Sequence, residues 1–259
     1  MSEASLVQIE SRGAVRILRL NYPAKRNALS LELRAELIEA VRDAMAAKAV
    51  RALVLTGNGG AFCAGGDISS MQAVGGVAGR QRLASLHELV RLLLAGPKPV
   101  IAAVEGYAYG AGMSLALLCD QVVAARDAKF CCSFNKVGLM PDMAALWTVP
   151  QRVDGGWAKR LLILAEEIDG ETALRIGLAD QVAEPGGALD AALALAGRFA
   201  ALAPLPIAFT KAVLARGPQP LEALLAQEAD GQALLFNSAD FAAGRDAFLA
   251  KRKPQFRGC

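Results

Sequence analysis

The sequence has a single histidine and no cysteine pattern, and both absences narrow the chemistry that it can support. His87 is the only histidine among 259 residues. The cysteines lack the C-x-x-C spacing of a zinc site, so we expect no bound metal. Their odd number, without a regular framework, favours reduced thiols in a cytoplasmic protein. These cysteines are Cys63, Cys119, Cys131, Cys132 and Cys259.

Long apolar runs and runs of one charge are also scarce. No stretch approaches the roughly 20 apolar residues that span a bilayer, and the first residues lack the pattern of an export signal. We therefore expect no membrane association. The net charge is only +3 and basic residues cluster only at 251–257, so we expect no nucleic-acid partner. This basic tail is either a solvated terminus or a clamp for an anionic ligand.

Two common phosphate-binding motifs are missing as well. The glycine run at 57–60 is not followed by the Lys-Ser/Thr pair of a P-loop. No glycine-rich turn completes the G-x-G-x-x-G fingerprint with an acidic residue on a following strand. The sequence therefore argues against both kinds of nucleotide site.

The chain does contain a large apolar fraction, 54%, which is ample for a packed core. An antiparallel strand pair is followed by strands that alternate with helices, and this alternation favours a mostly parallel sheet. Ser30 is the expected N-cap of the first helix. We predict strands over 6–10, 15–20, 52–56, 100–104, 121–125 and 180–183, and helices over 31–48, 83–94 and 111–118.

From residue 154 onward the pattern is mainly helical. We interpret residues 1–200 as a layered α/β core and residues 201–259 as a helical C-terminal region. Prolines at 204, 206, 218 and 220 separate the helices of this region. The predicted helices cover 157–165, 171–176, 189–202, 206–215, 221–237 and 239–251.

Two glycine-rich turns each follow a predicted buried strand. The first reads Ala-Phe-Cys-Ala-Gly-Gly-Asp-Ile over 61–68, and the second spans 106–114 and leads into a predicted helix. Glycine leaves backbone N–H groups accessible to a ligand. Two N–H groups that converge on one oxygen form an oxyanion hole, which a helix N-terminus strengthens. Each turn alone is also compatible with tight packing of a strand against a helix.

This pair of turns resembles the crotonase (enoyl-CoA hydratase/isomerase) family, whose shared chemistry is the stabilisation of a thioester enolate. The resemblance covers nearly the whole chain. It implies a crotonase-like α/β spiral of ββα units, with C-terminal helices that support a homotrimer or a dimer of trimers. It also implies an acyl-CoA thioester as the ligand, with coenzyme A as part of the substrate and no separate cofactor.

The resemblance assigns roles to individual residues. Gly66 and Ala111 would donate the two oxyanion N–H groups. Phe248 and Lys251 match an aromatic residue and a lysine of the family's last helix, which reach the coenzyme A of a neighbouring subunit. Within the loop 23–29, the alternative is an ordinary connection in which Asn27 satisfies backbone groups. Coenzyme A contacts are expected from Lys25, Arg26, Ala28, Ala64, Asp67 and Ile68.

Two departures from the family pattern bear on the reaction. Hydratases of the family carry two glutamates that position and activate water, and here Ser114 and Phe134 stand at those positions. Phe134 would contact the substrate instead. Water addition by the usual two-glutamate mechanism is therefore not expected.

A different carboxylate is available. In the segment Val-Gly-Leu-Met-Pro-Asp at 137–142, Asp142 matches the acidic residue that is the sole proton shuttle of the isomerase branch. We expect the apolar residues 143–147 to desolvate its carboxyl group and raise its pKa, as suits a base that must return a proton. The alternative is that Asp142 caps a helix running to about residue 152.

His87 is either an ordinary helix residue or a second catalytic group. Alignment with the 4-chlorobenzoyl-CoA dehalogenase branch places His87 at its general base and Asp142 at its nucleophile, but that branch has tryptophan where this chain has Phe134. Our leading hypothesis is a double-bond shift in an enoyl-CoA by Asp142, with Gly66 and Ala111 holding the enolate. The alternatives are hydrolysis or dehalogenation through Asp142 and His87, and a non-catalytic acyl-CoA-binding homologue.

Overall fold

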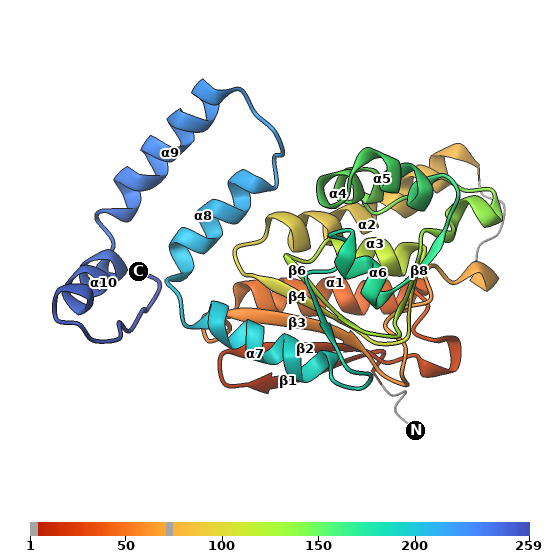
Figure 1. Ribbon diagram of the computed structural model, residues 1–259, viewed down its shortest axis with the longest axis horizontal. Coiled ribbons are helices and arrows are strands. Elements are labelled where there is room, and N and C mark those ends of the chain that lie inside the picture. Colours follow the sequence, from red (N-terminus) through yellow and green to blue (C-terminus); the bar gives the residue numbers. More distant parts are fainter. Residues whose placement is uncertain (1–4, 71–74) are drawn as a thin grey trace.

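The central sheet is built from the apolar strands that the sequence predicts. In the computed structural model, which describes residues 5–70 and 75–259, this sheet has six strands in the order β1-β2-β3-β4-β6-β9 (Figure 1). β1 and β2 are antiparallel and the other neighbours are parallel, as predicted. The strands are β1 Val7–Arg12, β2 Val15–Leu20, β3 Ala52–Gly57, β4 Val100–Val104, β6 Gln121–Ala125 and β9 Gln181–Ala183.

A second, smaller sheet lies beside the first. In the described residues it contains β5 Tyr107–Tyr109, β7 Lys129–Cys131 and β8 Glu167–Asp169, and a bridge between Cys63 and Ala108 extends it. β4, β5 and a helix form one ββα unit, and β6, β7 and a helix form the next. β3, the bridge at Cys63 and α2 form an earlier unit, so the chain winds as a spiral of ββα units. These strands of three residues are too short for the sequence pattern to reveal.

The two faces of the central sheet are covered by different helices. Successive side chains of a strand point to opposite faces. Leu53 and Leu55 of β3 therefore join the main core with α1 Leu31–Ala46, α2 Gly76–Ala95 and α3 Ala111–Leu117, whereas Ala52 and Val54 face the other way. The opposite face packs against α7 Ala188–Ala200, whose small buried residues are spaced by four: Ala188, Ala192 and Ala196.

The helices largely confirm the predicted elements. Ser30 caps α1, since its hydroxyl oxygen accepts the N–H of Leu33 at 3.2 Å. α2 begins at Gly76, well before the predicted residue 83, because the glycines near its start weaken the helical pattern. The connecting helices are α4 Ala145–Arg152, α5 Gly155–Leu162 and α6 Gly170–Arg175, and short 3₁₀ helices cover Pro23–Lys25, Ile68–Ser70 and Ser133–Val137.

The C-terminal helices α8 Pro204–Leu214, α9 Leu221–Leu235 and α10 Ala239–Leu249 extend to one side of the sheet (Figure 1). α9 has no buried residue. One attachment is Lys211 of α8, whose buried ammonium donates to the carboxylate of Asp120 at 2.5 Å and to the carbonyl of Lys98 at 2.9 Å. Among the described residues no single helix is long and apolar enough to cross a membrane, and α7 and α8 meet those criteria only as a pair bent by 110°.

Candidate active site

The two glycine-rich turns lie against each other. The N–H of Cys63 donates to the carbonyl of Tyr107 at 2.8 Å, and the N–H of Tyr109 donates to the carbonyl of Cys63 at 3.0 Å. Gly112 allows α3 to approach the first turn closely. A Cβ on Gly112 would lie 2.1 Å from the carbonyl oxygen of Cys63, so only glycine fits there without a shift of the backbone.

The N–H groups predicted for the oxyanion hole are both available. Among the described residues, the amide nitrogens of Gly66 and Ala111 have no hydrogen-bond partner. Gly66 forms a parallel bridge with Leu29 through its neighbours, since Leu29 N donates to Gly65 O at 2.7 Å and Asp67 N donates to Leu29 O at 3.4 Å. In a parallel bridge this pairing leaves the N–H of Gly66 directed away from Leu29.

The geometry of Gly65 brings the first turn against the start of α3. Gly65 has φ +102°, which non-glycine residues rarely adopt. A Cβ on Gly65 would lie 2.7 Å from the carbonyl oxygen of Tyr109 and 3.6 Å from the nitrogen of Ala111. The first turn thus touches the start of α3, where the N–H of Ala111 lacks an intrahelical partner. Two such donors can stabilise an oxyanion.

Cys63 lies within the first turn but is not a nucleophile in this state. Burial raises the pKa of its thiol to about 12, so the group is neutral near pH 7. In the described part of the chain, no cluster of three or more His, Cys, Asp or Glu side chains could hold a metal ion.

The loop 23–29 is a defined turn. Arg26 and Asn27 have φ of +49° and +58°. The fully buried side chain of Asn27 accepts the N–H of Tyr22 at 2.8 Å and donates to the carbonyls of Asn58 and Ala61 at 2.9 and 2.7 Å. Asn27 therefore does satisfy backbone groups, as one interpretation of the sequence proposed. This role fixes the conformation of the loop.

Two sets of hydrogen bonds join the loop to the first turn, and both involve residues expected to contact coenzyme A. Lys25 donates to the carboxylate of Asp67 at 2.9 Å and to the hydroxyl of Ser69 at 2.8 Å. The bond from Lys25 lowers the pKa of Asp67. The N–H of Ala64 donates to the carbonyl of Arg26 at 2.9 Å. Within this group Ala28 is buried and Ile68 is exposed.

Asp142 does not cap a helix, so that interpretation is wrong. α4 begins at Ala145, its N-cap is Ala144, and no side chain forms the capping hydrogen bond. Met143 and Ala144 both adopt the left-handed region, with φ of +49° and +60°. Such a conformation costs roughly 1–2 kcal/mol for each non-glycine residue. The strained turn places Asp142 before the start of α4, so its side chain does not reach the helix N-terminus.

The carboxyl group of Asp142 lies in an apolar environment. Its Oδ1 atom is buried and has no hydrogen-bond partner among the described residues. Burial raises the pKa of Asp142, while the charges of Arg34 and His87 oppose this shift. The direction predicted from the sequence is confirmed. Of the apolar residues that follow it, Met143 and Ala145 are buried, whereas Leu146 and Trp147 are exposed and so offer less shielding than expected.

The remaining residues of the site vary in exposure. His87 is exposed on α2, although its charge still acts on Asp142. Phe134 is buried in the 3₁₀ helix Ser133–Val137. Ser114 is buried on α3, and its hydroxyl donates to the carbonyl of Gly110 at 3.3 Å. Both positions that could carry a second carboxylate are thus occupied by groups that cannot accept a proton near neutral pH.

The residues at the C-terminal end are not brought to this site within one chain. Phe248 is 82% exposed on α10, and Lys251 is exposed after the end of that helix. Figure 1 shows α10 at the far end of the C-terminal helices, away from α4 and α2. Their contact with coenzyme A across subunits stays a prediction.

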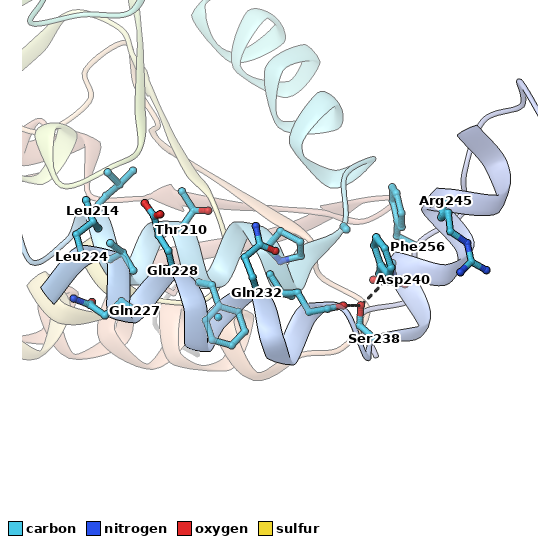
Figure 2. Close-up of a pocket in the computed structure, with 18 residues that line it drawn as sticks. Thr210, Leu214, Leu224, Gln227, Glu228, Gln232, Ser238, Asp240, Arg245 and Phe256 are labelled. Carbon is cyan, nitrogen blue, oxygen red and sulfur yellow. Dashed lines mark hydrogen bonds between the residues drawn. The ribbon is translucent and has the colours of Figure 1, made fainter. Parts of the chain in front are cut away.

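A wide groove lies in that same C-terminal region and not at the paired turns. It has a volume of about 790 Å³ and runs between α8, α9 and α10 (Figure 2). Thr210 and Leu214 line one side, and Leu224, Gln232 and Phe256 line others. Its lining contains none of the residues that we assign to the reaction.

Arg34 is a site residue that sequence reasoning missed. It lies on α1 and is only 4% exposed, and its Nε donates to the carbonyl of Leu29 at 3.0 Å. Its charge acts on Asp142, Cys63 and Asp67. The sequence did offer one indication, because this arginine lies beside Leu33, Leu37 and Val41 on the apolar face of the predicted helix.

The chain matches known proteins over nearly its whole length. The family model "Enoyl-CoA hydratase/isomerase" matches residues 10–259. The chain is 37% identical to 1,2-epoxyphenylacetyl-CoA isomerase of Escherichia coli over 100% of both chains, and 36% identical to crotonyl-CoA hydratase of Syntrophomonas wolfei over 96% of both. The crystal structure of an enoyl-CoA hydratase from a Polaromonas species superposes with a TM-score of 0.91 at 38% identity, covering 96% of this chain and 99% of the other.

Proposed function

The chain belongs to the enoyl-CoA hydratase/isomerase family, and within that family we propose that it shifts a carbon–carbon double bond in an enoyl-CoA thioester. Relatives named as isomerases and as hydratases match it about equally well, so the reaction must be argued from the site. The family likeness supports an acyl-CoA substrate. The side chains near the paired turns then decide which chemistry follows formation of an enolate.

One observation carries the proposal. Asp142 presents a buried carboxylate oxygen without a hydrogen-bond partner among the described residues, and Ser114 and Phe134 replace both glutamates of the hydratases. A single carboxylate can take a proton from one carbon and return it to another. Water addition normally requires a second group to hold the water molecule. The residues present thus favour isomerisation over hydration.

The proposed reaction proceeds in two proton transfers. Asp142, as a carboxylate, accepts a proton from the α-carbon of a 3-enoyl-CoA, and the electron pair of that C–H bond moves toward the thioester carbonyl, which forms a dienolate. The negative charge reaches the thioester oxygen, to which the N–H groups of Gly66 and Ala111 donate hydrogen bonds. Asp142 then returns its proton to the γ-carbon, which leaves the double bond between the α- and β-carbons.

The loop 23–29 and the first turn are the proposed binding surface for coenzyme A. Lys25 and Arg26 supply positive charge that suits the phosphates. Lys25 is held by Asp67 and Ser69, which limits the conformational entropy that binding would cost. Calorimetry with acetyl-CoA and longer acyl-CoAs should give binding, and a folded protein that binds none of them would remove this part of the proposal.

Hydrolysis or dehalogenation is the second candidate reaction, because the charge of His87 acts on Asp142. In that reaction Asp142 would be the nucleophile and His87 the general base. His87 is exposed and could exchange protons with water. A His87→Gln substitution should change turnover little if isomerisation is correct and greatly if the second reaction is correct.

We also propose that α8, α9 and α10 contact further copies of the chain in a homotrimer or a dimer of trimers. These helices expose several large apolar side chains, and α9 buries none against its own chain. The residues are Leu214, Leu221, Leu225, Leu234, Phe236, Phe241, Phe248 and Leu249. Light scattering that gives a strict monomer would contradict this assembly and the shared coenzyme A site.

The reaction is tested by NMR in heavy water with a panel of acyl-CoAs that includes 3-hexenoyl-CoA. Isomerisation predicts deuterium at the α- and γ-carbons together with a shifted double bond. Release of free coenzyme A or formation of a 3-hydroxyacyl-CoA would instead favour hydrolysis or hydration. Tight binding without any exchange would favour the non-catalytic homologue.

A further inference from the structure

The turn between α8 and α9 contacts α4 through a tryptophan ring. Gly217 lies in this turn and has φ +71°. A Cβ atom on Gly217 would lie 2.5 Å from Cη2 and 2.6 Å from Cζ2 of Trp147, so the indole ring rests directly against the glycine backbone. Both the positive φ and the lack of space favour glycine at this position. The turn therefore provides a surface that fits the ring of Trp147.

The turn is itself held from two sides. On α8, the buried ammonium of Lys211 donates to the carboxylate of Asp120 at 2.5 Å, which ties the helix to the core. On α9, the side chain of Gln227 accepts a hydrogen bond from Arg216 at 2.6 Å and donates one to Gln219 at 2.7 Å. The glycine lies between the two residues that are bonded to Gln227. Both C-terminal helices thus hold the surface on which the ring rests.

α4 depends on such external support. It has eight residues, and a helix of this length is not stable in isolation. Pro150 lies inside it and cannot donate a hydrogen bond to the carbonyl of Leu146. The side chains that α4 buries are few and mostly small: Ala145, Thr148 and Val149. The position of α4 is therefore set by what packs against it, and the α8–α9 turn does so through the tryptophan.

The first turn of α4 connects this contact to Asp142. The N–H of Trp147 donates to the carbonyl of Ala144 at 2.8 Å, and the N–H of Ala145 donates to the carbonyl of Asp142 at 3.1 Å. Met143 and Ala144 have positive φ, and such strained conformations persist only where the surrounding structure imposes them. A ring fixed by the α8–α9 turn helps to impose them, because these two backbone bonds link it to the strained residues.

We propose that Trp147 is a positioning residue through which the α8–α9 turn holds the connection that carries Asp142 for proton transfer. This inference rests on the proposed function, and it gives the C-terminal helices a role in the active site of their own chain. The carboxylate must reach both the α-carbon and the γ-carbon of the substrate. A displacement of about 1 Å can cost roughly 100-fold in rate. A constraint on the connection therefore affects turnover without touching the substrate.

The first test needs no substrate. Amide hydrogen exchange, followed by NMR, is measured in the wild type, Gly217→Ala and Gly13→Ala. The Cβ added by Gly217→Ala displaces the ring, so the N–H groups of Ala145 and Trp147 should exchange about 10-fold faster. Gly13→Ala is the matched control, because Gly13 also has positive φ, +58°, but nothing lies within 4 Å of its Cβ position. It should leave both exchange rates unchanged.

The second test measures the isomerisation of 3-hexenoyl-CoA. Trp147→Ala removes the ring without creating a clash, and kcat should fall about 10-fold while KM changes little. Trp147→Phe keeps a planar ring and should restore most of kcat. Trp157→Ala is the control, because it removes the other tryptophan of the chain, which stacks with Arg160 on α5. That variant should keep its kcat.

Two further measurements distinguish positioning from a general loss of packing. In the Trp147→Ala background, Gly217→Ala should cause little additional loss of kcat, because the added Cβ no longer meets a ring. The acid limb of kcat/KM in Trp147→Ala should stay at the wild-type pH. If the ring acted only by desolvating Asp142, its removal would lower the pKa of the carboxyl group and move this limb to lower pH.

The outcomes separate this inference from the proposed function. Unchanged exchange in Gly217→Ala, additive losses of kcat in the double variant, or a shifted acid limb in Trp147→Ala would each overturn the role of Trp147. Faster exchange at Ala145 and Trp147 together with full turnover in Asp142→Asn would keep the coupling between the turn and the connection but reject Asp142 as the base.

Discussion

The two parts of the candidate active site are built in different ways. The proposed oxyanion donors lie on two turns that backbone hydrogen bonds hold together, since Cys63 of the first turn pairs directly with Tyr107 and Tyr109 of β5. Asp142 instead lies in a connection between a 3₁₀ helix and α4, where Met143 and Ala144 adopt strained left-handed conformations. The segment before it exposes Val137, Leu139 and Met140.

This difference has a physical basis. Donors that stabilise charge must not reorganise during the reaction, so a turn locked between strands and a helix suits them. The group that acts as the base can differ between proteins that share this fold. Loops on a rigid scaffold provide positions for such variable groups. We therefore expect the donors to be common to the family chemistry and the base to set the individual reaction.

The largest expected effect comes from Asp142→Asn, which removes the base and leaves the turns intact. Asparagine has nearly the same size but cannot accept the proton, so isomerisation should fall by about 10²–10⁴-fold. Stability should change little, because Asp142 does not cap α4. In the wild type, kcat/KM should fall with decreasing pH through a carboxyl pKa that burial has raised above its ordinary value.

Stopped-flow absorbance with 3-hexenoyl-CoA and thermal denaturation measure both quantities. A matched control is Asp154→Ala, since Asp154 accepts the N–H of Trp157 at 2.8 Å as the N-cap of α5 and alanine cannot. That variant should lose stability and keep its rate. Retention of full activity in Asp142→Asn would show that the base is a different group.

Gly66→Pro tests the other part of the site. Proline has no N–H, so one oxyanion donor is lost while Asp142 is untouched. Turnover should fall by about 10²–10³-fold. Gly66→Ala keeps the N–H and serves as the control, and both variants are compared at saturating substrate. Equal activity in the proline and alanine variants would mean that the N–H of Gly66 is not used.

The contrast between the two turns and the connection that carries Asp142 also explains how much of the site can be predicted from the sequence. The turns can be predicted because the glycines at 65, 110 and 112 meet local requirements of φ or of space. The Ser30 cap and the alternation of strands with helices can be predicted for the same reason, because each depends on residues that are neighbours in the sequence. The direction of the Asp142 pKa shift was also predictable, since apolar residues follow it directly in the sequence.

Features that depend on distant residues could not be predicted in this way. Nothing local to Asp142 shows that Met143 and Ala144 adopt positive φ, and the capping interpretation failed for that reason. Arg34 reaches the first turn through its bond to the carbonyl of Leu29, which the fold alone creates. The strands β5, β7 and β8 are likewise defined by pairing between separate turns of the spiral.

Gly112→Ala tests whether the close contact between the two turns contributes to the stability of the protein. The added Cβ would lie 2.1 Å from the carbonyl oxygen of Cys63, so α3 and the first turn must move apart. We expect a loss of about 1–3 kcal/mol in the free energy of unfolding, with reduced turnover. Ala111→Gly is the control, because it keeps the N–H and adds no atom. Urea denaturation that shows no loss for Gly112→Ala would contradict the tight contact.

Ala144→Gly probes the strained connection and has the smallest expected effect. Glycine adopts φ near +60° without the cost that alanine bears, while it loses more backbone entropy on folding. The free energy of unfolding should therefore rise by less than about 1 kcal/mol. Turnover should fall about two- to five-fold, since a looser connection lets Asp142 leave its productive position. Ala165→Gly is the matched control, because Ala165 also has positive φ, +51°, but lies outside the site. It should gain similar stability without the loss of turnover, and equal turnover in both variants would mean that strain next to Asp142 has no part in aiming the base.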